Sequence, residues 1–157
     1  RSDKDALTGL YNRQAISEYA DRHFEKDPSA KGAMFMLDID NFKGVNDNFG
    51  HDFGDKVLVE ISDKLRKIFR SQDIISRIGG DEFCVFILNE VSREILSDRA
   101  TQVIKAVHRQ YSNWRCRVEI SVSIGIAVAP KNGEDFRTLY KSADDAMYKA
   151  KNSGKNA

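Results

Sequence analysis

The strongest constraint on the fold is a pair of β-rich runs in the middle of the chain, joined by a short Gly-Gly segment. The runs are Ile74-Ile75-Ser76-Arg77-Ile78 and Phe83-Cys84-Val85-Phe86-Ile87-Leu88, with Gly79-Gly80-Asp81-Glu82 between them. Gly-Gly between two such runs is typical of a tight β-hairpin, because primed turns require positive φ angles that glycine adopts freely. The sequence therefore predicts a central hairpin whose tip carries two adjacent carboxylates.

Helical and strand patterns alternate along the rest of the chain. Helices are expected over 12–26, 57–70, 96–111 and 136–150, and strands over 33–38 and 118–128. With the hairpin, the core order is β-α-β-β-α-β, flanked by an extra helix at each end. This order predicts an α+β fold with a ferredoxin-like βαββαβ core, in which helices cover a mainly antiparallel sheet. The 157 residues suffice for one domain and are too few for two ordinary ones.

The predicted topology brings distant carboxylates together. Right-handed crossovers place the strand over 33–38 beside the hairpin, so Asp38 at its end can lie next to Asp81 and Glu82. Clustered carboxylates repel one another, and a pair of Mg²⁺ ions would compensate their charge, since hard cations take carboxylate and backbone oxygens. Two such ions about 3.5–4 Å apart can hold both the attacking and the leaving oxygen of a phosphoryl displacement. The competing interpretation is that Asp38 only caps a turn.

Composition and spacing exclude several other classes. A net charge of +1, from 25 Lys+Arg against 24 Asp+Glu, argues against a dedicated nucleic-acid binder. The sequence contains no apolar run long enough to span a bilayer and no signal peptide. Its two cysteines cannot form a disulfide framework, and its three histidines lack partners at zinc-ligand spacing. An EF-hand loop from Asp38 would put Phe42 and Phe49 where oxygen ligands are required, and there is no GxxxxGK[ST] loop.

Five blocks of the sequence carry a family resemblance. They are Asp5-Ala6-Leu7-Thr8-Gly9-Leu10-Tyr11-Asn12-Arg13, the Asp- and Asn-rich stretch 38–55, Arg77-Ile78-Gly79-Gly80-Asp81-Glu82-Phe83, Ser123-Ile124-Gly125-Ile126-Ala127 and Ala143-Asp144-Asp145-Ala146-Met147-Tyr148-Lys149-Ala150-Lys151. In this order and spacing they resemble the GGDEF domain, the family of diguanylate cyclases, over essentially the whole chain. Because the chain begins at Arg1 rather than Met, we expect residues 1–157 to be a single GGDEF domain from a longer protein.

The resemblance implies a reaction and its metal ions. Two GTP molecules would condense to cyclic di-GMP and two pyrophosphates, as the 3′-hydroxyl of each attacks the α-phosphate of the other. Two Mg²⁺ (or Mn²⁺) ions would be bound by Asp38, the backbone carbonyl of Ile39, Asp81 and Glu82. We favour Asp81 as the acceptor of the hydroxyl proton, with Glu82 as the alternative base or a metal ligand only. Lys43 would neutralise charge that develops on the triphosphate.

The same resemblance implies the groups that select guanine. Asn46 and Asp55 would supply the amide and the carboxylate that read the base, and His51 lies in the same stretch, which we expect to be a loop. From the residues alone, Asn46 could instead form an Asx-turn, and Asp55 could be a helix N-cap.

Four further residues are expected to contact phosphates. Backbone amides of Asn41 and Phe42, which follow the first strand, could form an anion-binding nest. Lys151 would bind the β- and γ-phosphates together with Lys155, a position where the family usually has Arg. Both lysines would also suit the C-terminus of a helix on dipole grounds alone.

Arg70 and Asp73 form an RxxD pattern, with five residues between Asp73 and Gly79. In the family this spacing marks an inhibitory site for the product. Arg70 could stack on guanine and bind a phosphate, while Asp73 could accept hydrogen bonds from the guanine edge. The competing interpretation is an arginine at a helix C-terminus.

The implied partners follow from the reaction. A single domain holds one GTP, so catalysis requires a homodimer with two domains face to face, and we expect the isolated segment to be mostly monomeric. The alternative is a catalytically silent GGDEF module that acts as a receptor for GTP or cyclic di-GMP. GTP as substrate and the lack of an export signal predict a cytoplasmic location, with no nucleic-acid polymer as partner and no membrane contact from this segment.

Overall fold

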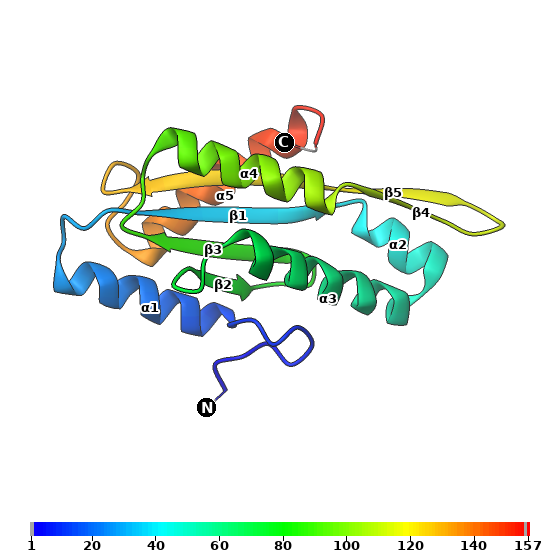
Figure 1. Cartoon of the computed structure of the whole chain (residues 1–157), viewed down its shortest axis with the longest axis horizontal. Coiled ribbons are helices and arrows are strands. Elements are labelled where there is room, and N and C mark those ends of the chain that lie inside the picture. The colour runs from blue at the N-terminus through cyan, green and yellow to red at the C-terminus, as the bar shows by residue number, and fades with distance from the viewer. Residues whose placement is uncertain (1, 156) are drawn as a thin grey trace.

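A five-stranded antiparallel sheet with the strand order β2-β3-β1-β5-β4 forms the centre of the molecule (Figure 1). The computed structural model describes residues 2–155 and residue 157. Its elements are α1 (Arg13–Lys26), β1 (Gly32–Asp40), α2 (Phe42–Phe49), α3 (His51–Ile68), β2 (Ile74–Arg77), β3 (Glu82–Leu88), α4 (Arg93–Val107), β4 (Arg109–Ser112), β5 (Arg117–Ala129) and α5 (Phe136–Asn152). The α+β class and the βαββαβ core are confirmed.

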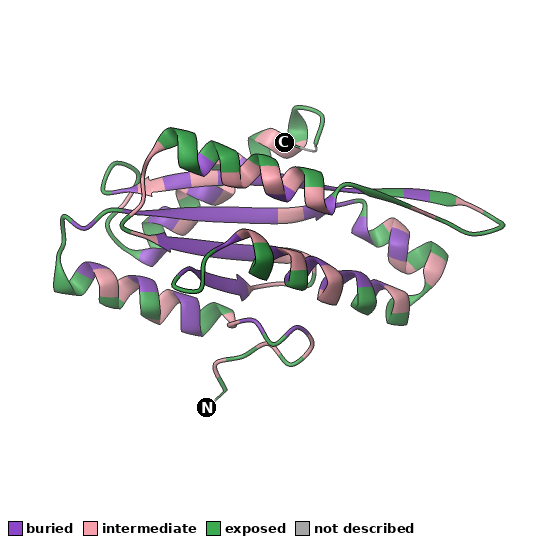
Figure 2. Cartoon of the chain, in the orientation of Figure 1, coloured by how far each residue is buried: buried purple, intermediate pink, exposed green. Residues whose placement is uncertain are grey.

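Both faces of the sheet are covered, so β1 is buried along almost its whole length (Figure 2). This explains why β1 is apolar at nearly every position before its acidic end. Alternate residues of β1, such as Phe35 and Leu37, pack with α3 and α4 on one face. The residues between them, such as Met34 and Met36, pack with α1 and α5 on the other face. None of the helices in the described part of the chain is long and apolar enough to cross a membrane.

Gly125 sets how closely α5 approaches the sheet. A Cβ atom built on Gly125 would lie 2.0 Å from the carbonyl oxygen of Ala143 and 2.2 Å from the backbone nitrogen of Met147. The missing side chain therefore lets the backbone of α5 rest directly on β5. This contact fixes the helix whose last turn carries Lys151.

The stretch 38–55 differs from the predicted loop. It contains the end of β1, the whole of α2 and the start of α3, which begins at His51 rather than near Val57. Gly50, with φ +90°, ends α2 and starts α3, and the apolar residues Phe42 and Val45 bury α2 against the core. Because Asp55 lies inside α3, the alternative of an N-cap at Asp55 is wrong.

The end of α4 and the hairpin that follows also differ from the prediction. The helix ends at Val107, and the next residues form β4, which pairs with the first part of β5. Tyr111, the last residue of the helix predicted over 96–111, lies on this strand instead and contacts Phe53 edge to face. Trp114 occupies the turn between β4 and β5 and is 90% exposed.

The central hairpin forms, but its turn is not the predicted primed type. Gly79 and Gly80 do not adopt positive φ. The connection spans four residues between β2 and β3 and is closed by a hydrogen bond from the Ile78 amide to the Glu82 carbonyl, 3.0 Å long. Arg77 supplies the remaining constraint, because its Nε and Nη2 both donate to the Gly80 carbonyl, at 3.1 and 2.9 Å. A longer loop held by a side chain has no need of the strained angles of a two-residue turn.

Candidate active site

The end of β1 and the start of β3 place three carboxylates at one edge of the sheet. Asp38 lies directly opposite Glu82 in the antiparallel register. The amide of Ile39 donates to the backbone carbonyl of Asp81, at 3.1 Å. The predicted juxtaposition of Asp38 with Asp81 and Glu82 is therefore confirmed. We call Asp38, Asp81 and Glu82 the acidic edge.

The acidic edge is electrostatically costly. Burial and the neighbouring charge of Asp81 raise the pKa of Asp38 to about 6, even though Lys151 lowers it. Burial and the charges of Asp81 and Asp144 also raise the pKa of Glu82. One oxygen of Asp38, Oδ1, is buried and accepts no hydrogen bond from any described residue. Groups perturbed in this way cluster at functional sites, where a ligand supplies the missing partner.

Lys151 pairs directly with the acidic edge. Its Nζ lies 3.3 Å from Asp38 Oδ2 and 2.9 Å from Asp40 Oδ1. Burial alone would lower the pKa of Lys151, but its contacts with Asp40 and Asp38 outweigh burial and raise the pKa. The helix α5 thus delivers a positive charge to the place where the sheet gathers negative ones.

Asp40 is a positioning residue that the sequence analysis did not identify. It is fully buried and accepts hydrogen bonds from the hydroxyls of Ser121 and Ser123, at 2.6 and 2.8 Å, as well as from Lys151. The pattern held a signal for this role, because the alternation in 118–128 puts two serines on the face where a buried carboxylate needs donors. Asp40 fixes Lys151 beside Asp38.

The acidic edge is suited to a divalent metal ion. Among the described residues, no three His, Cys, Asp or Glu side chains already converge on one metal position. Mg²⁺ does not require such a cage, because it is usually bound through one or two carboxylates together with substrate phosphates. The unpaired Oδ1 of Asp38 and the mutual repulsion of the edge are the features that such an ion would satisfy. Asp38, Asp81, Glu82 and the Ile39 carbonyl are the candidate ligands.

The residues predicted to bind phosphates lie at the start of α2 and the end of α5. Asn41, at φ +63°, precedes α2, and the amide of Phe42, the first residue of this helix, has no acceptor within the helix. Lys155 Nζ donates to the Asn41 side-chain oxygen at 3.4 Å, and Lys43 is exposed. The Phe42 side chain is buried, which leaves only its backbone for a ligand.

Asn46, His51 and Asp55 lie along the α2–α3 pair rather than on a loop. Asn46 Oδ1 would be 2.0 Å from a Cβ atom on Gly54, so the amide rests on α3 where only glycine leaves room. His51 and Asp55 are exposed on α3. In the described part of the chain, no hydrogen bond or ion pair joins either of them to the acidic edge.

Arg70 and Asp73 lie together in the segment between α3 and β2. Asp73 is buried, and its Oδ2 accepts a hydrogen bond from the Arg70 amide at 2.8 Å, while its Oδ1 has no hydrogen-bond partner in residues 2–155. The Arg70 guanidinium is half-exposed, with Nε 3.9 Å from Asp73. Both line a cavity of about 210 Å³ with Tyr11 and Arg66.

Comparison with known proteins gives one consistent result. The family described as "Diguanylate cyclase, GGDEF domain" matches residues 2–157. The bifunctional diguanylate cyclase/cyclic di-GMP phosphodiesterase MucR of Pseudomonas aeruginosa is 36% identical over 154 residues, which are 97% of this chain and 22% of MucR. The probable diguanylate cyclase DgcC of Escherichia coli is 32% identical over 161 residues, 99% of this chain and 42% of DgcC. The chain therefore spans less than half the length of these relatives.

A solved structure agrees with the sequence matches. The GGDEF domain of DgcB from Caulobacter crescentus, in complex with c-di-GMP, superposes with a TM-score of 0.87 at 28% identity, over 99% of this chain and 94% of that one. The order of the elements, the acidic turn between β2 and β3 and the match over residues 2–157 lead to the same assignment. The chain belongs to the GGDEF domain family.

Proposed function

We propose that this domain is a diguanylate cyclase, which joins two GTP molecules into cyclic di-GMP. The observation that carries the proposal is the acidic edge, in which Asp38 faces Glu82 across paired strands and keeps one buried oxygen unpaired. A site that concentrates negative charge without enough donors is suited to divalent cations and the phosphates that they bring. The family assignment supports the same reaction class.

The chemistry assigns a role to each group at the edge. Bound Mg²⁺ or Mn²⁺ would polarise the phosphate and lower the pKa of the attacking 3′-hydroxyl. Asp81 accepts the proton of that hydroxyl, with Glu82 as the alternative acceptor, while the new P–O bond forms and the bond to pyrophosphate breaks. Lys43 and Lys151 offset the charge on the departing phosphates. Lys151 is supported in this role by its position 3.3 Å from Asp38.

Guanine selection rests on the α2–α3 pair. Asn46 is held against Gly54, one residue before Asp55, so an amide and a carboxylate are carried by adjoining helical turns. They supply the donor and the acceptors that the guanine edge requires, with His51 beside them at the start of α3. The phosphates of the bound GTP would be contacted by Asn41, Phe42 and Lys155.

A homodimer is part of the proposal. One domain offers one acidic edge and thus one GTP, and the second reacting GTP comes from a partner domain related by twofold symmetry. The specific activity of the isolated domain should therefore rise with protein concentration. A constant specific activity across the monomeric range would contradict this requirement. GTP as substrate also supports a cytoplasmic location.

The direct test is incubation of the protein with GTP and Mg²⁺, with mass spectrometry of the products. We expect cyclic di-GMP and pyrophosphate, and we expect both to disappear when the metal is removed by EDTA or when Asp81→Asn replaces the wild type. No product at high protein concentration, together with retained binding of GTP or cyclic di-GMP, would replace this proposal with the receptor alternative.

Arg70 and Asp73 are proposed to bind the product as an inhibitor. The unpaired, buried Oδ1 of Asp73 can accept hydrogen bonds from a guanine edge, and the half-exposed Arg70 can stack on the base. Arg70→Ala should shift the cyclic di-GMP inhibition curve to higher concentration, whereas Lys67→Ala, an exposed cation on the last turn of α3, should not. Superimposable inhibition curves for Arg70→Ala and the wild type would remove this role.

A further inference from the structure

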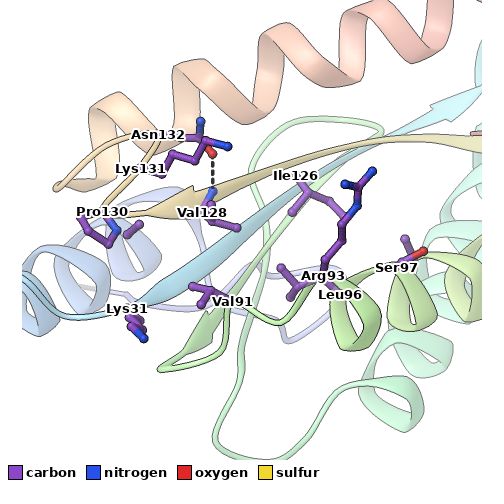
Figure 3. A pocket seen from close by; sticks show the side chains of 12 residues that line it. Lys31, Val91, Arg93, Leu96, Ser97, Ile126, Val128, Pro130, Lys131 and Asn132 are labelled. Carbon is purple, nitrogen blue, oxygen red and sulfur yellow. Dashed lines mark hydrogen bonds between the residues drawn. The ribbon is translucent and has the colours of Figure 1, made fainter.

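A cavity of about 660 Å³ opens between α4 and the end of β5, at the end of the sheet opposite the acidic edge (Figure 3). Leu96 and Ala100 of α4 line one side, and Ile126 and Val128 of β5 line the other. The strand register shows the separation, since Val128 pairs with Ala33 at the start of β1 and the acidic edge lies at its end. Nothing in the proposed cyclase chemistry uses this cavity.

The cavity arises because the apolar face of β5 extends beyond its helical cover. On that face Val118, Ile120, Val122 and Ile124 are buried in the core, whereas Ile126 and Val128, the next two, stay partly exposed. The strand therefore presents apolar surface where α4 has not yet closed over the sheet. A concave apolar floor of this kind is the usual form of a small-molecule site, and its volume falls within the common range of about 300–1,000 Å³.

The rim of the cavity is basic. Lys31, Arg93 and Lys131 line it, and no acidic residue does. All three are exposed, and within the described residues none of them forms an ion pair. Arg93 is also the first residue of α4, where the helix dipole adds partial positive charge. An anion would therefore gain favourable electrostatics at the mouth while its apolar part fills the floor.

The walls are held in place by hydrogen bonds that do not use these cations. Asn132 Oδ1 accepts from the Val128 amide at 2.8 Å, which fixes the turn after β5 (Figure 3). Ser92 caps α4 through the Ile95 amide, and Glu90 accepts from the Ser92 amide at 2.7 Å. The nearby carboxylate of Glu90 is thus directed to the backbone of the cap, and the site is formed before any ligand arrives.

We propose that this cavity binds a small organic anion with an apolar body, such as an aromatic or aliphatic carboxylate, sulfonate or phosphate. The apolar floor supplies affinity, and Lys31, Arg93 and Lys131 select negative charge. This site is separate from the acidic edge and from the cavity beside Arg70. The proposal does not depend on whether the domain makes cyclic di-GMP.

A pair of matched fluorescent probes tests the proposal on the folded domain. 8-Anilinonaphthalene-1-sulfonate carries an anionic group, and N-phenyl-1-naphthylamine has the same aromatic body without it. We expect saturable binding of one sulfonate probe per chain, at least about tenfold tighter than the neutral probe, because the rim contributes several cation contacts. Equal affinities would overturn the selection of anions, and no saturable binding would overturn the site.

Variants locate the binding. Arg93→Gln combined with Lys131→Gln should weaken the sulfonate probe about tenfold and change the neutral probe less than about twofold. Lys105→Gln, an exposed cation on the same helix outside the cavity, is the matched control and should change neither. Sulfonate binding that survives the double substitution would place the probe elsewhere and contradict the proposal.

Filling the cavity gives an independent readout. Ala100→Trp should abolish binding of both probes, because the indole would occupy the apolar floor. Should Ala100→Trp fail to give a cooperative thermal transition, Ser97→Trp at the exposed rim serves the same purpose with less disturbance of the core. Unchanged binding in a folded filled variant would overturn the proposal.

Discussion

Two aspartates near the end of strand β1 differ in their surroundings. Asp38 and Asp40 are separated by one residue of β1, so they lie on the same face of the sheet. Asp40 accepts hydrogen bonds from two serines and Lys151 and is fully buried. Asp38 shares Lys151, faces two further carboxylates and leaves one buried oxygen without a donor.

The difference separates a carboxylate that holds the fold together from one that is prepared for a ligand. The buried charge of Asp40 is compensated within the protein, so removing it leaves unsatisfied donors behind. The charge of Asp38 is compensated only in part, by the Lys151 that it shares with Asp40, so the folded domain without ligands bears the remaining repulsion from Asp81 and Glu82. Substitution of Asp38 should therefore reduce activity more than stability, and substitution of Asp40 should reduce stability more than activity.

The largest effect is expected for Asp38→Asn. Loss of the carboxylate should reduce the rate of cyclic di-GMP formation by about 10³-fold or more, as for other groups that stabilise transition-state charge. The unfolding midpoint in urea without metal should stay the same or rise, because a repulsive charge has been removed. Product formation measured under saturating GTP, alongside urea unfolding, gives both readouts. Substantial remaining activity would place the chemistry away from Asp38.

Asp40→Asn should instead reduce stability more than activity. Breaking a buried and hydrogen-bonded charge while Lys151 remains should lower the free energy of unfolding by about 3 kcal/mol. Urea unfolding followed by circular dichroism measures this loss, with Asp38→Asn as the matched variant two residues away. Equal stability of the two variants would erase the distinction between the two aspartates.

Gly125→Ala tests how closely α5 packs on the sheet. This helix carries Lys151, which pairs with both Asp38 and Asp40. The added methyl group would collide with the backbone of α5, so the helix must shift, at a cost of about 1–3 kcal/mol. Gly44→Ala is the control, because its Cβ would meet only Val118 Cγ1 at 3.6 Å and alanine favours a helix. Thermal unfolding of both variants checks the prediction. A Gly125→Ala domain as stable as the wild type would show that α5 does not rest on the strand as closely as described.

These contrasts also show how far the sequence alone could lead. Strand order and hairpin position are set by hydrophobic period and by chain connectivity, so the approach of Asp38 to Asp81 and Glu82 could be predicted. The alternation in 118–128 offers two serines as donors, but their pairing with Asp40 could not be predicted, because it depends on which side chains of β5 face it across the sheet. The registers that bring Ser121 and Ser123 to it are known only once the strands pair.

The missed elements have similar causes. Helix α2 is eight residues long and rich in Asn, Asp and Gly, which locally favour turns, and it is stabilised by burial of Phe42 and Val45. Strand β4 has four residues, mostly exposed, and forms because it pairs with β5. The conformation of Gly79 and Gly80 depends on the Arg77 side chain. In each case a tertiary contact overrides the local preference.

The smallest predicted effect concerns Asp5, which pairs with the arginine that holds the turn beside the acidic edge. Arg77, which holds the Gly80 carbonyl, pairs with Asp5 in the N-terminal segment at 3.0 Å. Burial alone would raise the pKa of Asp5, but hydrogen bonds from Thr8 and the charge of Arg77 outweigh burial and lower the pKa below its usual 3.8. Asp5→Asn should therefore reduce the free energy of unfolding at neutral pH by about 1 kcal/mol.

The pH dependence of that difference distinguishes an ionic contribution from simple packing. A carboxyl group whose pKa is lower in the folded state contributes stability above its unfolded pKa and loses it as the pH falls through the folded value. The gap between wild type and Asp5→Asn should thus be full at pH 6 and should narrow below about pH 4. Urea unfolding of both proteins across this range measures the gap. A gap that persists unchanged in acid would mean that the ionised form of Asp5 contributes nothing. Gly80 would then be held by Arg77 without help from its ion pair, and the turn side of the acidic edge, unlike the Asp40 side, would not depend on a compensated charge.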